Sequence, residues 1–160
     1  MGNFYNGYSW TERYNKYREL ERKIASREQR PPQGPCALCG DPEGDFEYHD
    51  EDYSLPYLWT EPALYVLCRH CHRHKLHQRF SRPVLWQAFL AHVRRGGYAS
   101  DLKDPTVKKE IAACCKAIKE GRKPNLPMRR PYTRMIGEEW FARLHLDRGS
   151  LTDPGARPRP

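Results

Sequence analysis

CALC at Cys36–Cys39 and CRHC at Cys68–Cys71 are the two stretches of sequence that decide the fold of this chain. Each is a Cys-x-x-Cys knuckle, a spacing that lets two sulfurs bind the same ion. Four thiolates from two knuckles close a tetrahedral shell around one zinc ion and leave no open position for catalysis. We therefore predict a structural zinc site with four ligands: Cys36, Cys39, Cys68 and Cys71. Iron is the alternative ion, because a rubredoxin-type site uses the same two knuckles.

A metal site also suits the size and composition of the chain. It has 160 residues, of which 38% are hydrophobic, and it contains 14 prolines, so we do not expect a large central core. We predict an α+β fold with a small core stapled by zinc and α-helical extensions on both sides. The expected divisions are an N-terminal helical extension (1–30), a zinc-binding core (31–100), C-terminal helices (101–147) and a disordered tail (148–160).

Capping and turn signals predict where the elements begin and end. Ser9 and Glu12 form a capping box that starts a helix running towards Arg27, with Tyr14 and Tyr17 in the stripe expected to pack. The other expected elements are short strands over 45–49 and 64–67, a helix capped by Ser81, a helix starting at Asp104-Pro105, and a last helix over 137–146.

Charge is distributed unevenly along the chain, whose formal net charge is +8. Positions 31–67 hold eight acids and no Lys or Arg, whereas positions 62–100 hold seven basic residues and no acid. Such a basic segment suits phosphate binding, so we expect nucleic acid, chiefly DNA, as the partner. The candidate phosphate contacts are Arg69, Arg73, Lys75 and Arg79.

A histidine cluster adjoins the second knuckle. His72 directly follows Cys71 at the expected start of a helix, His77 lies five positions on, and His49 ends a predicted strand. A strand and a helix that carry histidines at these points can bring imidazoles together around a cation. Such an ion would bind a scissile phosphate, while an imidazole without a metal would take a proton from water.

These stretches together resemble the zinc-containing HNH endonucleases, also called ββα-metal or His-Me finger enzymes, particularly the small phage and mobile-element forms. The resemblance covers positions 36–80 and rests on Cys36-x-x-Cys39-Gly40, Glu47-Tyr48-His49-Asp50, Asp52-Tyr53-Ser54 and Leu67-Cys68-x-x-Cys71-His72. It implies that the core at 31–100 is HNH-like, with a treble-clef or ββα fold and a structural zinc beneath the ββα unit. It also implies a catalytic divalent ion, Mg²⁺ or Mn²⁺. It also implies His49 as the general base, His72 as a ligand of that ion and His77 as a second ligand.

The chain departs from the family pattern at three points. Tyr48 stands where the family has a metal-binding His or Asp, and an alternative register makes His49 the ligand and Asp50 the base. His72 and His77 are five residues apart rather than four, which on a regular helix turns His77 about 100° further away. The family's Asn between the two halves also has no counterpart.

Two functions therefore follow from the sequence. The first is an HNH-like endonuclease that hydrolyses phosphodiester bonds. The alternative is a catalytically inactive zinc module that binds nucleic acid or a nucleic-acid-handling protein, as an interaction or inhibitor protein. The chain opens without an apolar signal segment and has no run long enough to span a bilayer, so we expect a cytoplasmic protein without membrane contact.

Overall fold

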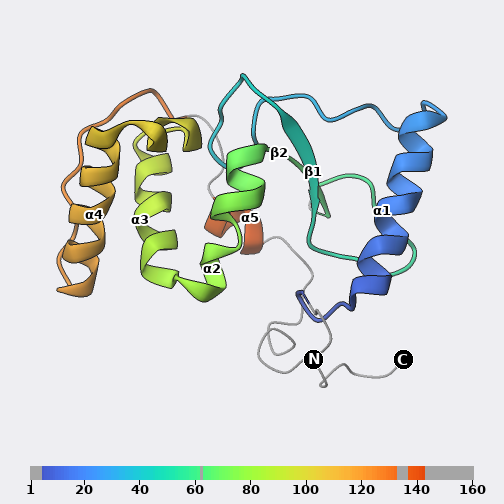
Figure 1. The fold of residues 1–160 in the computed structure, drawn as a ribbon, viewed down its shortest axis with the longest axis horizontal. Helices are drawn as coiled ribbons and strands as arrows, with labels where there is room; N and C mark the ends of the chain where they lie inside the picture. The colour runs from blue at the N-terminus through green and yellow to red at the C-terminus, as the bar shows by residue number, and fades with distance from the viewer. Residues whose placement is uncertain (1–4, 62, 133–136, 143–160) are drawn as a thin grey trace. The chain divides into compact units, whose positions relative to one another are not determined.

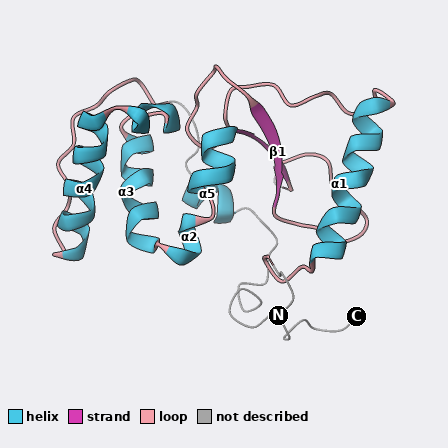
Figure 2. Ribbon diagram, viewed as in Figure 1, coloured by secondary structure: helices cyan, strands magenta, loops and turns pink. Residues whose placement is uncertain are grey.

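A computed structural model describes residues 5–61, 63–132 and 137–142 (Figure 1). The described part of the chain contains helices, loops and one two-stranded sheet, so the predicted mixed α+β class is confirmed (Figure 2). None of the described helices is long and apolar enough to cross a bilayer. In order, the elements are α1 (Trp10–Ala25), β1 (Phe46–Asp50), β2 (Leu64–Cys68), the π-helix η1 (Cys71–Lys75), α2 (Gln78–Ser81), α3 (Pro83–Arg94), the 3₁₀-helix η2 (Ala99–Lys103), α4 (Pro105–Lys119) and α5 (Gly137–Ala142).

The chain divides into two compact units. Among the described residues, the first unit comprises positions 5–32 and 50–65, and the second comprises positions 33–49 and 66–142 apart from 133–136. The first unit contains α1, and the second contains both cysteine knuckles, η1 and the later helices.

In the first unit, the predicted capping box begins α1. The Ser9 side chain accepts from the Glu12 amide at 3.3 Å, and the Glu12 carboxylate accepts from the Ser9 amide at 2.8 Å. Leu20 is buried, but Tyr14 and Tyr17 are 40% and 53% exposed, so the prediction that these tyrosines pack was wrong. An i, i+3, i+4 pattern does not distinguish a packed stripe from an exposed one.

In the first unit, residues of the N-terminal segment pair with three consecutive acids, Asp50, Glu51 and Asp52. Lys16 is fully buried, and its Nζ lies 2.5 Å from Oδ1 of Asp50. The Asn6 amide donates to Oε2 of Glu51 at 2.8 Å. A third acid, Asp52, accepts from the Tyr8 hydroxyl at 2.8 Å. Because burying a charge is costly unless it is paired, these contacts explain how consecutive carboxylates lie inside a small unit.

In the second unit, backbone hydrogen bonds hold the knuckles to the sheet. The Arg69 amide, just after β2, donates to the carbonyl of Asp45, just before β1, at 3.0 Å, so the two strands run antiparallel. The Ala37 amide donates to the Val66 carbonyl at 2.8 Å and ties the first knuckle to β2. The strands expected over 45–49 and 64–67 lie within one residue of the observed β1 and β2.

The helices α3 and α4 pack on each other and enclose an apolar cluster of Ala88, Val107, Ile111 and Cys114. Asp104 caps α4 as predicted, because its Oδ1 accepts from the Thr106 amide at 2.7 Å. Ser81, by contrast, is the last residue of α2, and α3 begins at Pro83 without a side-chain cap. The predicted Ser81 cap is therefore wrong, since a proline at the first helical position begins a helix without one.

The last helix, α5, begins at Gly137 as predicted. A Cβ at this glycine would lie 2.8 Å from Leu38 and 3.1 Å from Trp86, so the start of α5 approaches both the first knuckle and α3. The remainder of the predicted helix, positions 143–146, and the tail at 148–160 lie outside the described residues.

Candidate metal centre

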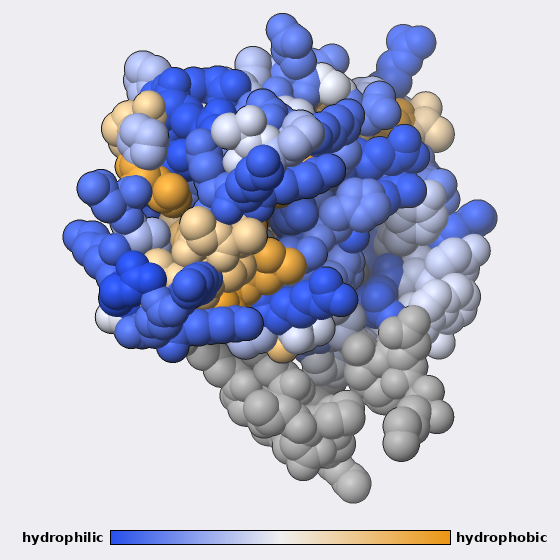
Figure 3. Space-filling view, turned by 60° about the vertical axis from the view of Figure 1, so that its left-hand side comes forward, coloured by the Kyte–Doolittle hydropathy of each residue, from blue (hydrophilic) through white to orange (hydrophobic). Residues whose placement is uncertain are grey.

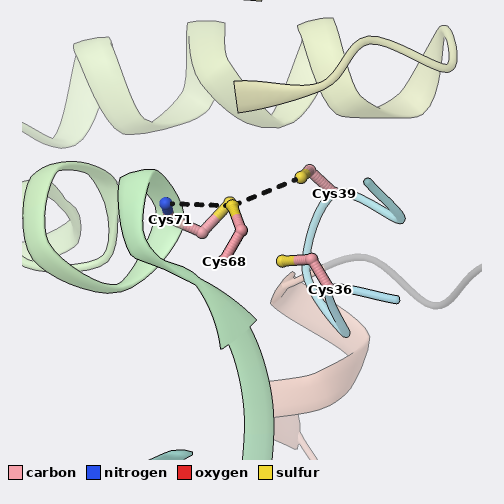
Figure 4. A group of neighbouring side chains, drawn as sticks. All are labelled: Cys36, Cys39, Cys68 and Cys71. Atoms are coloured by element: carbon pink, nitrogen blue, oxygen red, sulfur yellow. Dashed lines mark hydrogen bonds between the residues drawn. The ribbon is translucent and has the colours of Figure 1, made fainter. Parts of the chain in front are cut away.

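The four knuckle cysteines converge in the second unit. Their sulfurs all lie within 4.8 Å of one another, and each residue is at most 5% exposed. Figure 4 shows the sulfurs of Cys36 and Cys39, from one turn, pointing towards those of Cys68 at the end of β2 and Cys71 at the start of η1. Cys39 and Cys68 are 3.9 Å apart at Sγ. Zn–S bonds of about 2.3 Å in a tetrahedron place the sulfurs roughly 3.8 Å apart, so this spacing fits a metal.

Backbone geometry explains why the first knuckle adopts this shape. Gly40 has a φ of 77°, a left-handed conformation that glycine adopts without strain. Its amide donates to the Cys36 carbonyl at 2.8 Å, and the Cys36 amide donates to the Asp41 carbonyl at 2.9 Å. In the second knuckle, the Cys71 amide lies 3.5 Å from the Cys68 sulfur, where it stabilises a thiolate.

The electrostatics of the cluster also call for a cation. Burial, together with contacts to the other three sulfurs, raises the pKa of the Cys71 thiol. Contacts with Cys36 and Cys68 raise the pKa of Cys39 as well. Four thiolates this close repel one another, and a divalent ion removes that repulsion and binds them in their ionised form. The residues present therefore fit a metal ion such as zinc.

Among the residues that the structure describes, this is the one group of three or more potential ligands whose atoms approach so closely. The cysteines are free rather than bridged, as a metal site requires. The coarse prediction, a cysteine cluster that can hold a metal, is confirmed.

Two of the predicted site histidines come together beside this cluster. His49 lies in β1, His72 lies in η1 directly after Cys71, and their ring centroids are 5.1 Å apart at an interplanar angle of 67°. The Nδ1–H of His72 donates to Oε2 of Glu47 at 2.7 Å. A carboxylate that holds one ring nitrogen fixes the tautomer and leaves Nε2 with a free lone pair, the arrangement found behind metal-bound histidines.

Glu47 is the residue that sequence reasoning missed. Besides His72, it pairs with Arg73, whose Nη2 lies 2.5 Å from Oε1. Burial alone would raise the pKa of the Glu47 carboxyl, but the hydrogen bonds from Arg73 and His72 lower it. The signal was available, because Glu47 and His49 are two residues apart in a strand and hence share a face.

The spacing of His72 and His77 has a structural explanation. The helix after the second knuckle opens with a π-turn, in which the Leu76 amide donates to the Cys71 carbonyl, five residues back, at 2.9 Å. A π-turn holds one more residue than an α-turn, so a step of five takes the place of a step of four. The helix expected to start after the second knuckle therefore begins as a π-turn and not as a regular α-helix.

The burial and contacts of His49, and the surroundings of His77 and Asp50, bear on the predicted site as well. His49 is only 4% exposed, and its ring lies 5.7 Å from that of Trp140 in α5. His77 follows η1 and precedes α2, and it joins no three-ligand group within the described ranges. Asp50, the base in the alternative register, is paired with Lys16 in the first unit.

The predicted phosphate contacts differ in their surroundings. Arg69 and Arg73 are half exposed and share the Glu47 carboxylate, at 3.6 Å and 2.5 Å. Arg79 lies over the ring of Phe80, 4.3 Å from its centroid. Lys75 is partly buried near α3 and α4 rather than beside the histidines.

No protein-family model matches this chain, and comparisons with curated proteins and with solved structures find no match.

Proposed function

We propose that this protein is an HNH-type, metal-dependent endonuclease built on a four-cysteine zinc module of the treble-clef or ββα kind. One observation carries the proposal: His72, held by Glu47 next to the second knuckle, lies ring to ring with His49 of β1. The order β1, β2, η1 is the strand–strand–helix order of the ββα unit. The π-turn supports the resemblance too, because it accounts for the five-residue step between His72 and His77.

In this proposal the histidines have separate roles. His72 Nε2 would hold a divalent ion, Mg²⁺ or Mn²⁺, with water and phosphate oxygens completing its coordination, and His77 would be a second ligand. When bound, the ion would stabilise negative charge on the phosphate and on the leaving oxygen. His49 would act as the general base, at a ring distance from His72 of 5.1 Å.

The reaction would be a hydrolysis. A water oxygen attacks phosphorus as the bond from phosphorus to the leaving oxygen breaks, and the water proton passes to the His49 imidazole. The leaving oxygen takes its proton from solvent. Arg69 and Arg73, half exposed beside Glu47, would contact phosphates that flank the cut, with Lys75 and Arg79 further along.

Plasmid nicking tests the proposal. Purified protein should relax supercoiled DNA with Mg²⁺ or Mn²⁺, and His49→Ala should reduce the rate by about 10²- to 10⁴-fold, the usual contribution of a general base. The matched control is His74→Ala, an exposed histidine of η1. Both variants should keep their metal content. Equal rates for the two variants, or no nicking with any divalent ion, would contradict a nuclease.

A second candidate function is favoured by one observation. Trp140 lies against His49, which is 4% exposed, so a phosphate has little access to that ring unless α5 moves. An inactive zinc module that binds nucleic acid, or a protein that handles it, would look the same. It should bind an oligonucleotide with an affinity that falls steeply with salt, without cleavage and without sensitivity to His72→Ala.

A further inference from the structure

A shallow apolar groove runs between α3 and α4 in the second unit. It consists of two adjoining hollows of about 290 Å³ and 220 Å³ that share the side chain of Leu85. Aliphatic and aromatic side chains form its floor: Val84, Leu85, Phe89, Leu102 and Ile111, with Pro83 and Cys115 at one end. We call this surface the α3–α4 groove. Of the residues that line it, the nuclease proposal uses only Lys75.

The polar residues around the groove are almost all cationic. Its lining contains four basic side chains, one glutamine and no acid. None of these four forms an ion pair with a carboxylate anywhere in the described part of the chain. The four are Lys75, Arg82, Lys108 and Lys119.

Two acids of the same unit pair with arginines that lie outside the groove lining. Glu110 of α4 pairs with Arg95 and Arg129, away from the groove lining. Asp101 pairs with Arg130, at 2.7 Å between Oδ2 and Nη1. Because no described carboxylate forms an ion pair with the four basic side chains of the lining, a partner that brings carboxylates would be attracted to them.

Figure 3 turns the side that carries α3 and α4 forward and shows apolar surface (orange) lying among hydrophilic side chains (blue). Apolar surface enclosed by a charged rim is typical of protein interaction sites. A nucleic acid strand would use the cations but would gain little from a floor of aliphatic side chains, since bases stack on exposed aromatic faces. Phe89, the one aromatic ring in the lining, is 1% exposed.

We propose that the α3–α4 groove binds a partner protein through an acidic amphipathic helix. Apolar side chains of that helix, one turn apart, enter the two hollows on either side of Leu85. Its carboxylates then face the lysines and the arginine of the rim. This is helix-in-groove recognition with complementary charge, and it does not depend on whether the protein cleaves nucleic acid.

Three synthetic peptides probe the groove. The first is an 18-residue helical peptide with leucines at i, i+4 and i+7 and glutamates between them. The second has lysines in place of the glutamates, and the third keeps the glutamates but has alanines in place of the leucines. By fluorescence anisotropy, the first should bind at least about tenfold more tightly than either of the others, because both apolar contact and charge are required.

Two matched double variants locate the binding. Lys108→Glu with Lys119→Glu reverses two rim charges and should weaken binding of the first peptide by about tenfold or more. Lys109→Glu with Lys116→Glu makes the same charge change on α4 outside the lining, and it should change binding by less than about twofold. Both double variants should keep the plasmid-nicking rate and metal content of the parent.

Several outcomes would overturn the proposal. The first is equal weakening by the two double variants, which would mean only general attraction between charges. The second is equal binding of the leucine and alanine peptides, and the third is no binding of the first peptide at millimolar concentration. A loss of oligonucleotide binding, but not of peptide binding, in the Lys108/Lys119 variant would assign the groove to nucleic acid instead.

Discussion

At the scale of single residues, Glu47 of β1 contacts the residues that directly follow the second cysteine knuckle, where the proposed active site lies. It accepts from His72 and from Arg73, and these contacts lower its pKa even though it is partly buried. A carboxylate held in its ionised form accepts from Nδ1–H of His72 and leaves Nε2 as the nitrogen that could bind a metal. The same carboxylate restrains Arg73 at the surface where a phosphate would arrive.

We expect Glu47→Gln to weaken Mn²⁺ binding and slow plasmid nicking by about 10- to 100-fold, the usual effect of losing a carboxylate behind a metal-bound histidine. Isothermal titration with Mn²⁺ and the nicking assay measure the two effects. Asp45→Asn is the matched control, because Asp45 is exposed and contacts Arg69 but not His72. Unchanged Mn²⁺ affinity in Glu47→Gln would separate Glu47 from any metal at His72.

At the scale of elements, the π-turn of η1 absorbs one residue between the second knuckle and α2. A π-turn is an α-helix with a single insertion, so removing one of its residues should restore an α-turn and leave both flanks in place. The same removal from α3 would rotate every later side chain of that helix by about 100° and move Phe89 and Val93 out of the core.

Deletion of His74 should therefore leave a folded protein with its full metal content, whereas deletion of Gln87, an exposed residue of α3, should unfold the second unit. Circular dichroism melting and metal analysis report the result. Equal damage by both deletions would mean that the π-turn is not a local insertion.

The acidic run after β1 gives a second prediction at this scale. Burial raises the pKa of the Asp50 carboxyl from 3.8 to about 7, against the attraction of Lys16 and with help from the neighbouring Asp52 and Glu51. Between about pH 4 and about pH 7, folded Asp50 holds a proton that the unfolded chain has released. The free energy of unfolding should therefore fall as the pH rises through this window. At 1.36 kcal/mol per pKa unit, the loss is at most about 4 kcal/mol.

Asp50→Asn should remove this pH-dependent loss of unfolding free energy, and Asp52→Asn should not. Burial would raise the pKa of Asp52 too, but hydrogen bonds from Ser54 and Tyr8 lower it, so its stabilising effect disappears as the pH falls. Denaturant unfolding of the three proteins from pH 4 to pH 8 compares the slopes. If both variants change the slope in the same direction, the assignment of opposite pKa shifts is wrong.

At the scale of the whole molecule, local signals predicted the elements well. The knuckles, the Ser9 capping box and the Asp104 cap each depend on residues within four positions of one another, and the structure has them all. The partners of buried charges could not be predicted, because Lys16 meets Asp50 across a separation that no periodicity encodes. The exposure of Tyr14 and Tyr17 was missed for the same reason, because an apolar stripe on a helix does not show whether another element packs against it.

The same contrast between local signals and long-range contacts applies to the candidate site. The two cysteine pairs and the position of His72 beside the second pair follow from the knuckle spacing, which acts over a few residues. The pairing of Glu47 with His72 joins a strand to a helix 25 residues later. The contact of Trp140 with His49 spans more of the chain still, and it decides how open the proposed base is. Long-range pairings of this kind depend on tertiary packing rather than on local sequence.

The whole account depends on Cys36, Cys39, Cys68 and Cys71 sharing one metal ion, because a shared ion would hold together the two knuckles and the strand and helix that carry the histidines. X-ray absorption spectroscopy at the zinc edge of the purified protein, with metal analysis of the same sample, tests this most directly. We predict one zinc per chain, surrounded by four sulfurs at about 2.3 Å. Protein without metal, cysteines joined in disulfides, or a zinc bound by nitrogen or oxygen in place of sulfur would contradict it.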